Sequence, residues 1–450
     1  MSLPRYPKYK DSEVEWLGKV PGHWEVKRLK QACHVFPSNV DKKSYEEETP
    51  TLLCNYTDVY YNETITKNMN FMTATASADQ ITKFTLRAGD TIITKDSETA
   101  DDIAIAAYVP DDLPGIVCGY HLSMVRPLPS TNGAFVKRLF DSTYAKSCFA
   151  VRANGLTRVG LGQYELDNVE LPFPPFSEQT QIAAFLDRET AKIDELVAEQ
   201  RRLMALLKEK RQAVISHAVT RGLNPDTPLR PSGIEWLGDV PGHWVVIALK
   251  RIADVKTGMA KGKDHGTRTT VAVPYLRVAN VQDGYLDLEV IATMEIPADD
   301  VARYALQRGD VLMNEGGDFD KLGRGCVWDG QIEPCITQNH VFAVRPRSVS
   351  SAWLNAFTGT DFAQFFFMTR SKQSTNLASI SSTNLMELPV LLPPTAEQSE
   401  ILAFIAAQTS SFDTLTTEAQ RAITLMQERR TALISAAVTG QIDVRGMVAA

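Results

Sequence analysis

The sequence has no long apolar run and few cysteines. No stretch of about 18 apolar residues occurs, so we expect no membrane-spanning helix. The opening residues, MSLPRYPKYKDSEVEW, lack the apolar stretch of a secretory signal, and this predicts a cytoplasmic protein. The six cysteines are scattered without a C-x-x-C pair, so we expect neither a disulfide framework nor a zinc site.

Motifs of enzymes that act on nucleotides are also missing. The sequence has no GxxxxGK[ST] loop for ATP and no Gly-rich strand–turn–helix segment for S-adenosylmethionine. FPPF (173–176) resembles the signature of amino-methyltransferases, but Phe173 replaces the polar residue that accepts hydrogen bonds from the target amine. We find no nucleophile–base pair and no metal cluster. The chain is therefore expected to be non-catalytic and to hold no cofactor or metal of its own.

The formal net charge of −7 does not by itself favour a nucleic-acid ligand. Proteins that bind phosphates normally present a basic face to them. Local basic clusters exist, as at Lys27, Arg28 and Lys30, but such clusters are more often solvated surface. If DNA is the ligand, we expect a partner to supply part of the positive surface.

The chain consists of two copies of one unit. Residues 15–30 and 235–250 share twelve of sixteen positions, including Trp24 and Trp244. Such self-similarity is the mark of an internal repeat. Two further pairs of segments repeat, 174–196 with 393–415 and 210–220 with 429–439. The repeated segments form a common frame for the two halves.

The segments between the frame pieces have diverged. Residues 31–165 and 251–385 share only islands of sequence. The islands include Gly89-Asp90 with Gly309-Asp310 and Val125-Arg126-Pro127 with Val344-Arg345-Pro346. A shared frame with unlike inserts predicts a protein that recognises two different things at a set separation.

The segments that follow Pro175 and Pro394 are expected to form two long helices. Their apolar residues recur with the three–four alternation of a coiled coil, and the first predicted seam includes Leu196 and Leu203. Each helix would run for about 37 residues, or roughly 55 Å. We expect the two to pack as an antiparallel coiled-coil spacer.

The inserts combine strand-like and helical patterns. TIIT (91–94) and VFAVRP (341–346) are typical of strands, and residues 133–150 and 351–368 of helices. An EWLG phrase follows the first long helix, but none follows the second, and the matching phrase stands near the start of the chain. The repeating unit is therefore cyclic and is cut open at the termini. This predicts neighbouring termini and an approximate two-fold rotation between the halves.

The predicted fold class is α+β, with two mixed α/β domains joined by the helix pair. The predicted divisions are 1–170, the first insert domain with its frame segment; 171–222, the central helix; 223–387, the second insert domain; and 388–450, the distal helix and tail.

This doubled arrangement resembles the DNA specificity subunit of type I restriction-modification systems. The resemblance rests on the paired EWLG-x-VPGHW phrases, the paired PP-x-x-EQ helix starts and the ISHAVT and ISAAVT helix ends. Segments 87–98, 118–127, 309–325 and 338–346 also look like parts of that family's target-recognition domains. The resemblance covers nearly the whole chain.

The resemblance implies that each insert reads one half of a split, asymmetric double-stranded DNA target while the helices set the gap. It further implies two methyltransferase (modification) subunits, which carry S-adenosylmethionine and methylate adenine N6. Restriction/translocase subunits that use ATP and Mg would join them for cleavage.

Direct readout of base edges in the major groove uses Arg or Lys for guanine and Asn or Gln for adenine. By residue type and position in family-like loops, the candidate DNA-binding residues are Lys95, Tyr120, His121, Lys321, Arg324, Gln338, Asn339 and His340. A histidine beside a strand is more often structural, and the Tyr60-Tyr61 pair is more often part of a core than a stacking surface. The frame tryptophans Trp16, Trp24, Trp236 and Trp244 are expected to anchor the frame.

Three alternatives stay open. A coiled-coil scaffold with two protein-binding heads is favoured by the negative charge and disfavoured by the family-like loops. A specificity subunit for a stand-alone methyltransferase would have the same sequence pattern. A self-contained modification enzyme is disfavoured by the missing cofactor motif.

Overall fold

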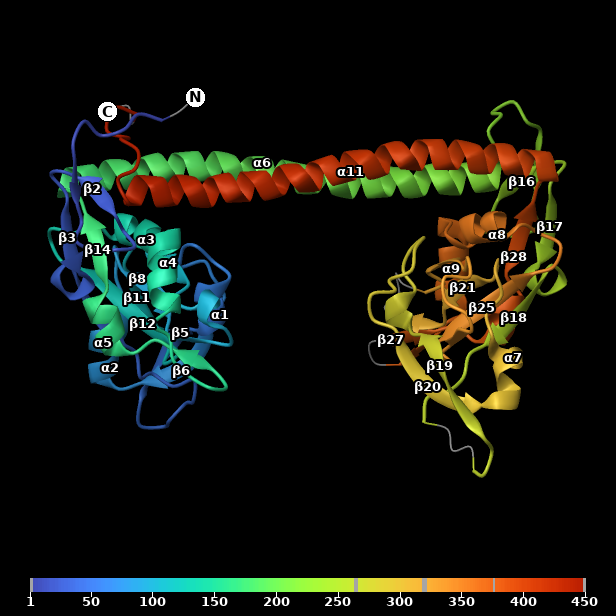
Figure 1. Cartoon of the computed structure of the whole chain (residues 1–450), viewed down its shortest axis with the longest axis horizontal. Coiled ribbons are helices and arrows are strands. Elements are labelled where there is room, and N and C mark those ends of the chain that lie inside the picture. The colour runs from blue at the N-terminus through green and yellow to red at the C-terminus, as the bar shows by residue number, and fades with distance from the viewer. Residues whose placement is uncertain (1–2, 263–265, 318–321, 375–376, 448–450) are drawn as a thin grey trace. The chain divides into compact units, whose positions relative to one another are not determined.

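The protein is described by a computed structural model that covers residues 3–262, 266–317, 322–374 and 377–447. It consists of two compact units (Figure 1). Unit 1 comprises Met1–Gln200 and Gln420–Ala450, and unit 2 comprises Arg201–Ala419. Each unit mixes small sheets with helices, so the α+β fold class is confirmed.

The repeated EWLG phrase builds the same small frame in each unit. In both frames the strands pair antiparallel: β1 (Tyr9–Asp11) with β2 (Lys19–Pro21), β3 (Glu25–Arg28) with β14 (Glu170–Phe173), β15 (Leu229–Pro231) with β16 (Asp239–Pro241), and β17 (Val245–Ala248) with β28 (Pro389–Leu392). Trp24 and Trp244 are buried, as expected of anchors. The same expectation is wrong for Trp16 and Trp236, which are 58% and 43% exposed because they lie on the turns before β2 and β16.

The head of unit 1 contains two four-stranded sheets. The first, in the order β10-β8-β12-β4, is antiparallel and is formed by β4 (Cys33–Pro37), β8 (Thr91–Thr94), β10 (Ala106–Tyr108) and β12 (Leu122–Pro127). The second, β6-β5-β11-β7, is formed by β5 (Thr49–Cys54), β6 (Met72–Ala76), β7 (Thr85–Leu86) and β11 (Leu113–Cys118). Strands β5 and β11 are parallel, with Cys54 opposite Cys118, and a core that includes Ile92 and Met124 lies between the sheets.

The head of unit 2 repeats this plan with fewer strands. One sheet has the order β18-β25-β21-β23 and contains β18 (Ala253–Thr257), β21 (Val311–Asn314), β23 (Gly325–Val327) and β25 (Val341–Pro346). The other has the order β20-β19-β24 and contains β19 (Thr270–Leu276), β20 (Ala292–Pro297) and β24 (Ile336–Thr337), with β19 and β24 parallel. The strands predicted at 91–94 and 341–346 are confirmed.

Each helical stretch predicted in the inserts is a pair of helices rather than one. Residues 133–150 form α3 (Gly133–Asp141) and α4 (Thr143–Ala150), and residues 351–368 fall in α8 (Ser351–Thr358) and α9 (Asp361–Arg370). Ser142 and Thr360 interrupt them because their hydroxyls accept hydrogen bonds from the amides of Ala145 and Ala363 and so cap new helices.

The remaining elements are short. They are α1 (Tyr56–Tyr60), α2 (Ala78–Phe84), α5 (Gln163–Asn168), α7 (Val301–Tyr304), α10 (Ser382–Met386), β9 (Asp96–Ser97), β13 (Val159–Gly160), β22 (Gly316–Gly317), β26 (Lys372–Ser374), β27 (Leu377–Ser379), and the 3-10 helices η1 (Leu29–Gln31), η2 (Ala100–Asp102), η3 (Leu249–Arg251), η4 (Val278–Asn280) and η5 (Ala298–Asp300). Strand β9, which follows β8, pairs with β13. Strand β22, which follows β21, pairs with β27.

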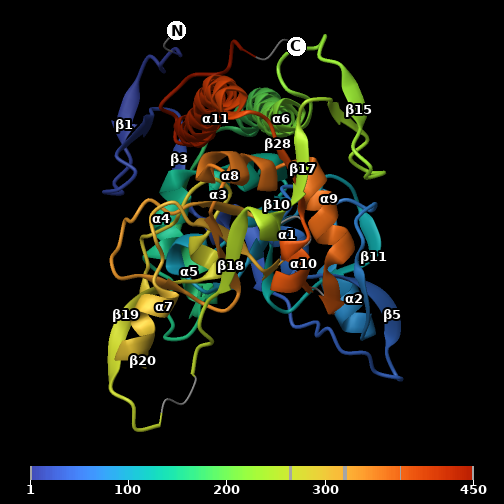
Figure 2. The same cartoon turned by 90° about the vertical axis from the view of Figure 1, so that its right-hand side faces the viewer.

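Two long helices, α6 (Phe176–Arg221, 46 residues) and α11 (Thr395–Val438, 44 residues), run through both units. Within each unit the parts of α6 and α11 lie side by side and antiparallel (Figures 1 and 2). They are longer than the predicted length of about 37 residues because the helices include the ISHAVT and ISAAV segments. In the described part of the chain, none of the helices is long and apolar enough to cross a membrane.

The predicted seam between the long helices is confirmed at Ile193 and Leu207, which are buried, and is displaced by one residue between them. Leu196 and Leu203, which were expected in the seam, are 53% and 41% exposed, whereas Val197 is buried. Both choices obey the same three–four alternation, so periodicity alone does not separate them. Polar contacts that bind the helices to the heads lie on the observed seam, such as the hydrogen bond from Arg138 to Thr190.

The PP-x-x-EQ motif starts each long helix with a side-chain hydrogen bond. Gln179 Nε2 donates to the carbonyl oxygen of Pro174 at 2.8 Å, and Gln398 Nε2 donates to that of Pro393 at 2.9 Å. Proline has no amide hydrogen to lose at a helix start, and it fixes φ near the helical value. The motif therefore sets where the helix begins in both units.

Both long helices end at a glycine in the left-handed region. Gly222 has φ +78° and Gly440 has φ +73°, and glycine adopts this conformation without steric cost. A Cβ at Gly440 would lie 2.3 Å from Pro21 Cδ, so no other residue fits there.

The two terminal segments meet in unit 1 (Figure 1). The amide of Asp443 donates to the carbonyl oxygen of Pro4 at 2.8 Å, and the Arg445 guanidinium lies 4.9 Å from the centre of the Tyr6 ring. The proximity expected from the cyclic repeat is confirmed.

The long helices belong to the core of each head. In unit 1, Trp24 and Phe135 pack in one cluster with Ile182 of α6 and Val438 of α11. In unit 2, Trp244 and Trp353 pack in one cluster with Val219 of α6 and Ile401 of α11. Buried apolar area of this kind dominates the stability of a domain, so each head is held to its helix pair by a continuous core.

Candidate nucleic-acid interface

Three of the predicted residues meet beside β8 in unit 1. Lys95 follows β8, and Tyr120 and His121 precede β12. The amide of Lys95 donates to the carbonyl oxygen of His121 at 3.2 Å. His121 Nδ1 lies 2.7 Å from Asp96 Oδ2, so a neighbouring carboxylate orients the imidazole ring. The structure thus brings Lys95, Tyr120 and His121 together.

A groove of about 300 Å³ opens in front of these residues. It is lined by Lys42, Asn55, Tyr56, Thr57, Met72, Gly119, Tyr120 and His121. The Tyr120 ring is 38% exposed and lies 3.7 Å from the His121 ring between centroids. The groove lies at the carboxyl ends of the parallel strands β5 and β11, where loops of an open sheet commonly bind ligands.

The loop that contains Arg158 also contacts this group of residues. Arg158, just before β13, donates to Asp96 Oδ1 at 2.8 Å, so Asp96 contacts both His121 and Arg158. Leu156, on the same loop, is fully exposed. This places a cation and an apolar side chain on the surface next to the groove.

Tyr60 and Tyr61 do not pack in a core, which corrects the sequence-based expectation. Tyr61 is 76% exposed, and its ring meets the Tyr60 ring edge-on at 5.0 Å. The Tyr60 hydroxyl donates to Asp102 Oδ2 at 2.7 Å, and this hydrogen bond raises the pKa of Tyr60 to about 12. Tyr60 is the last residue of α1 and Tyr61 is its C-cap, so both lie at the end of a short surface helix.

The predicted residues of unit 2 meet at the equivalent place. Gln338, Asn339 and His340 precede β25, and Glu315 follows β21. His340 Nδ1 lies 3.1 Å from Glu315 Oε2, and Asn339 Nδ2 lies 3.3 Å from His340 Nε2. The amide of Glu315 donates to the carbonyl oxygen of His340 at 2.9 Å, as that of Lys95 does to His121. A carboxylate therefore lies beside the imidazole ring of each histidine.

Arg324 is half-buried on the turn before β23. Its carbonyl oxygen accepts a hydrogen bond from the amide of Asn314 at 3.0 Å, which places it beside Glu315. Lys321, the other predicted residue of this loop, lies outside the described residues.

A buried ion pair joins the two central strands of each head. Arg126 donates to both carboxylate oxygens of Asp90, at 2.8 and 2.7 Å, and Arg345 donates to those of Asp310 at 2.7 Å each. Both carboxylates are buried. The pairs tie β12 to the turn before β8 and β25 to that before β21, at the end of these strands away from Lys95 and Glu315.

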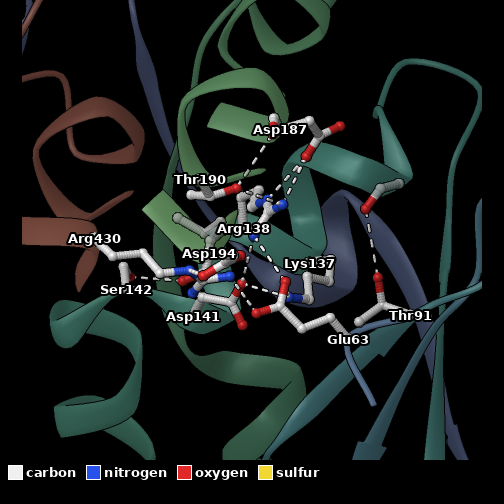
Figure 3. Close-up of polar contacts among 12 residues, drawn as sticks. Glu63, Thr91, Lys137, Arg138, Asp141, Ser142, Asp187, Thr190, Asp194 and Arg430 are labelled. Atoms are coloured by element: carbon white, nitrogen blue, oxygen red, sulfur yellow. Dashed lines mark hydrogen bonds and ion pairs between the residues drawn. The ribbon is translucent and has the colours of Figure 1, made fainter. Parts of the chain in front are cut away.

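A larger ion network ties the head of unit 1 to both long helices (Figure 3). Lys137 of α3 donates to Glu63 at 3.1 Å and to Asp141 at 2.7 Å, although its side chain is only 4% exposed. Its neighbour Arg138 donates to Asp187 of α6 at 2.8 Å. Each buried cation is thus matched by carboxylates, as its burial requires.

Arg430 brings α11 into the same network. Its guanidinium pairs with Glu63, and its Nε lies 3.0 Å from Asp194 of α6. Burial disfavours the charged form of Glu63, but attraction by Lys137, Arg430 and Arg138 outweighs it and lowers the pKa of Glu63 from 4.5 to about 2. The helix α8 of unit 2 can be aligned with α3 by their N-caps, Ser350 and Asn132. At the positions of Lys137 and Arg138 it carries Asn355 and Ala356, so unit 2 lacks the two cations and the network belongs to unit 1.

Among the described residues, no cluster of three or more His, Cys, Asp or Glu side chains could hold a metal ion. The polar contacts found around the predicted residues join neighbouring loops to one another. Exposed amide, cationic and aromatic side chains at strand ends can meet base edges, phosphates and base faces.

Sequence reasoning missed Asn55, Tyr56, Asp96, Arg158 and Glu315. They come from segments far apart in the chain, and no local motif marks them. One signal was available: Lys95 and Glu315 occupy equivalent places after the repeated Gly-Asp islands, so the residues after each island could have been compared.

The fold defines a class of protein with two related α+β heads on a shared pair of long helices. The chain belongs to the type I restriction modification DNA specificity domain family, whose sequence profile matches residues 21–202 and 241–425. The sequence resemblance is thereby confirmed, and the scaffold alternative is not favoured.

Several known proteins are similar to this chain. The type I restriction enzyme EcoKI specificity subunit of Escherichia coli (strain K12) is 24% identical over 342 residues, which cover 74% of this chain and 69% of that protein. The StySPI specificity subunit of Salmonella potsdam is 23% identical over 335 residues, with the same coverage. A solved structure on complex assembly and conformational transition of the type I R-M system has a TM-score of 0.68 at 18% identity, covering 93% of this chain and 98% of that chain, and it shows the same fold.

Proposed function

We propose that the two heads each read one half of an asymmetric, split double-stranded DNA target. One observation carries the proposal: the heads share their positioning contacts and differ in the side chains that these contacts present. The amides of Lys95 and Glu315 donate alike to the carbonyl oxygens of His121 and His340, whereas Tyr120 beside the first contact is Asn339 beside the second.

We propose further that the chain acts without chemistry of its own, as the DNA-reading part of a cytoplasmic complex. Two methyltransferase subunits would bring S-adenosylmethionine and methylate adenine N6, and restriction/translocase subunits would bring ATP and Mg. Family membership supports association with other restriction-modification subunits. The net charge of −7 also supports partners that add positive surface around the DNA.

The long helices would set the gap between the half-sites. At 1.5 Å per residue, 46 residues make α6 about 69 Å long, which is about two turns of B-DNA. A seven-residue insertion at matching points of α6 and α11 preserves the seam and adds about 10 Å. We expect a longer gap between unchanged half-sites. A change of bases within a half-site would contradict a spacer role.

The test of DNA reading is to co-express the chain with its neighbouring methyltransferase gene and to map N6-methyladenine across the genome. We expect a bipartite asymmetric motif, and replacing 31–165 by the insert of another family member should change one half only. Unmethylated DNA despite a stable complex would refute the proposal and would favour the alternative function, a scaffold that binds proteins. Methyl transfer by the isolated chain would refute the non-catalytic role.

A further inference from the structure

Hydrogen bonds of the backbone show which residues of the two heads stand at the same place. The amide of Tyr120 donates to Val40 at 3.0 Å, and that of Asn339 donates to Met259 at 3.1 Å. Each amide meets the loop that follows the first strand of the head, three residues after β4 or two residues after β18. Tyr120 and Asn339 are therefore equivalent although their side chains have nothing in common.

A second pair is found at the ends of the parallel strands. Asn55 follows β5 and Arg277 follows β19, and both begin a short helical turn. The amide of Asn55 donates to Asp58 Oδ2 at 2.7 Å, and the amide of Arg277 donates to Asn280 Oδ1 at 2.9 Å. The shared geometry makes Asn55 and Arg277 equivalent.

The two pairs lie next to each other in each head. The amide of Gly119 donates to the carbonyl oxygen of Cys54 at 2.9 Å, which joins the residues just before Tyr120 and Asn55. In unit 2 the amide of Gln338 donates to the carbonyl oxygen of Leu276, also at 2.9 Å. A Cβ at Gly119 would lie 2.8 Å from the Cys54 oxygen, so this close approach requires glycine in unit 1.

The side chains on this common backbone offer different contacts. In unit 1 the groove presents the carboxamide of Asn55 and the exposed Tyr120 ring. In unit 2 the same places hold the carboxamide of Asn339 and the guanidinium of Arg277. Arg277 Nη2 donates to the carbonyl oxygen of Val290 at 3.3 Å, and Nε is buried without a hydrogen-bond partner among the described residues. Nη1 makes no hydrogen bond with the described residues, so its hydrogens are the donors left for a ligand.

We propose, building on the DNA-reading function above, that these two positions determine the bases read by each head. Arg277 contacts a guanine in the half-site of unit 2. Asn55 and Tyr120 contact an A·T pair at the equivalent place in the half-site of unit 1. Arg pairs with O6 and N7 of guanine, Asn with N6 and N7 of adenine, and an apolar ring face meets the thymine methyl group.

The test uses the full chain in complex with its methyltransferase and maps N6-methyladenine for Arg277→Asn and Asn55→Arg. For Arg277→Asn we expect the preference for one guanine in the second half-site to fall about tenfold or more, with the first half-site unchanged. For Asn55→Arg we expect the change in the first half-site alone. Arg308→Asn, at an exposed arginine of unit 2, is the matched control and should leave the motif as it is.

The outcomes separate the inference from the function on which it rests. If the unsubstituted chain yields no bipartite motif, DNA reading itself fails. If its motif is bipartite and Arg277→Asn lowers methylation equally at all sequences, Arg277 contacts phosphate and the inference is wrong. If Arg277→Asn does not fold, Arg277→Lys keeps the charge without the planar fork and should still weaken the guanine preference. An unchanged motif in a stable Arg277→Lys complex would also overturn the inference.

Discussion

Arg126 Nη2 lies 2.7 Å from Asp90 Oδ2, and the carboxylate of Asp90 is only 1% exposed. The same distance and the same exposure recur between Arg345 and Asp310 in the second head. The pair explains why Gly-Asp and Val-Arg-Pro persist as islands in inserts that otherwise differ. Between the two inserts, the side chains that pair across strands are the same, whereas those on the loops differ.

Replacing Asp90 by Asn should destabilise unit 1 by about 3 kcal/mol, because the substitution leaves a largely buried guanidinium without its charge partner. Asp310→Asn should do the same in unit 2. Urea unfolding with hydrogen exchange would assign each loss to its unit. Asp111→Asn, at an exposed carboxylate, is the control. A loss spread equally over both units would contradict local action.

Glu63 should make the stability of unit 1 depend on pH in acid. Its folded pKa of about 2 lies below the ordinary 4.5, so its contribution is present above pH 4.5 and is lost as pH falls towards 2. Glu63→Gln should therefore flatten the decline of stability between these values. Urea unfolding at pH 5.5 and pH 3 would measure it, with exposed Glu46→Gln as the control. Equal slopes in Glu63→Gln and the unsubstituted protein would show that Glu63 is not the cause.

Ser435 of α11 and Ser216 of α6 should each stabilise the contact between a long helix and a head, and by about the same free energy. The Thr143 amide donates to Ser435 Oγ and the Asp361 amide to Ser216 Oγ, both at 2.9 Å. Ser435→Ala and Ser216→Ala should each cost about 1 kcal/mol, the usual worth of one hydrogen bond. Faster hydrogen exchange of Thr143 in the first variant and Asp361 in the second is the readout. Unchanged protection of either amide would rule out that contact.

All six cysteines should resist thiol reagents in the folded protein, because every one is buried. Burial raises the pKa of Cys33, Cys326 and Cys335 to about 12, and thiolate is the reactive form. Titration with dithionitrobenzoate at pH 8 should be slow in buffer and reach six thiols in guanidinium. Rapid reaction of any thiol in buffer would contradict the packing.

Much of the fold follows from the repeat. The repeated frame predicted two units and the contact between the terminal segments, and strand-like runs in the inserts predicted the strands at 91–94 and 341–346. These features depend on local pattern, which the sequence carries directly. The seam of the long helices followed only in part, because Leu196 and Val197 both satisfy the same periodicity and only the structure shows that Val197 is the buried one.

The site was predicted only in part. Tyr120, His121, Asn339 and His340 stand on short segments beside repeated islands and could be proposed from sequence. Asn55 and Arg277 could not, because their place beside these residues arises from parallel strand pairing between segments more than fifty residues apart.

The sequence by itself determined that this is a duplicated protein of the DNA specificity family, because the repeat and the spacing of its motifs can be read directly from the order of the residues. The tertiary structure alone decided that Asn55 and Arg277, two unlike side chains, stand at equivalent places in the two heads. Equivalence of that kind is defined by hydrogen bonds between distant strands, which insertions in the loops conceal from any comparison made along the sequence.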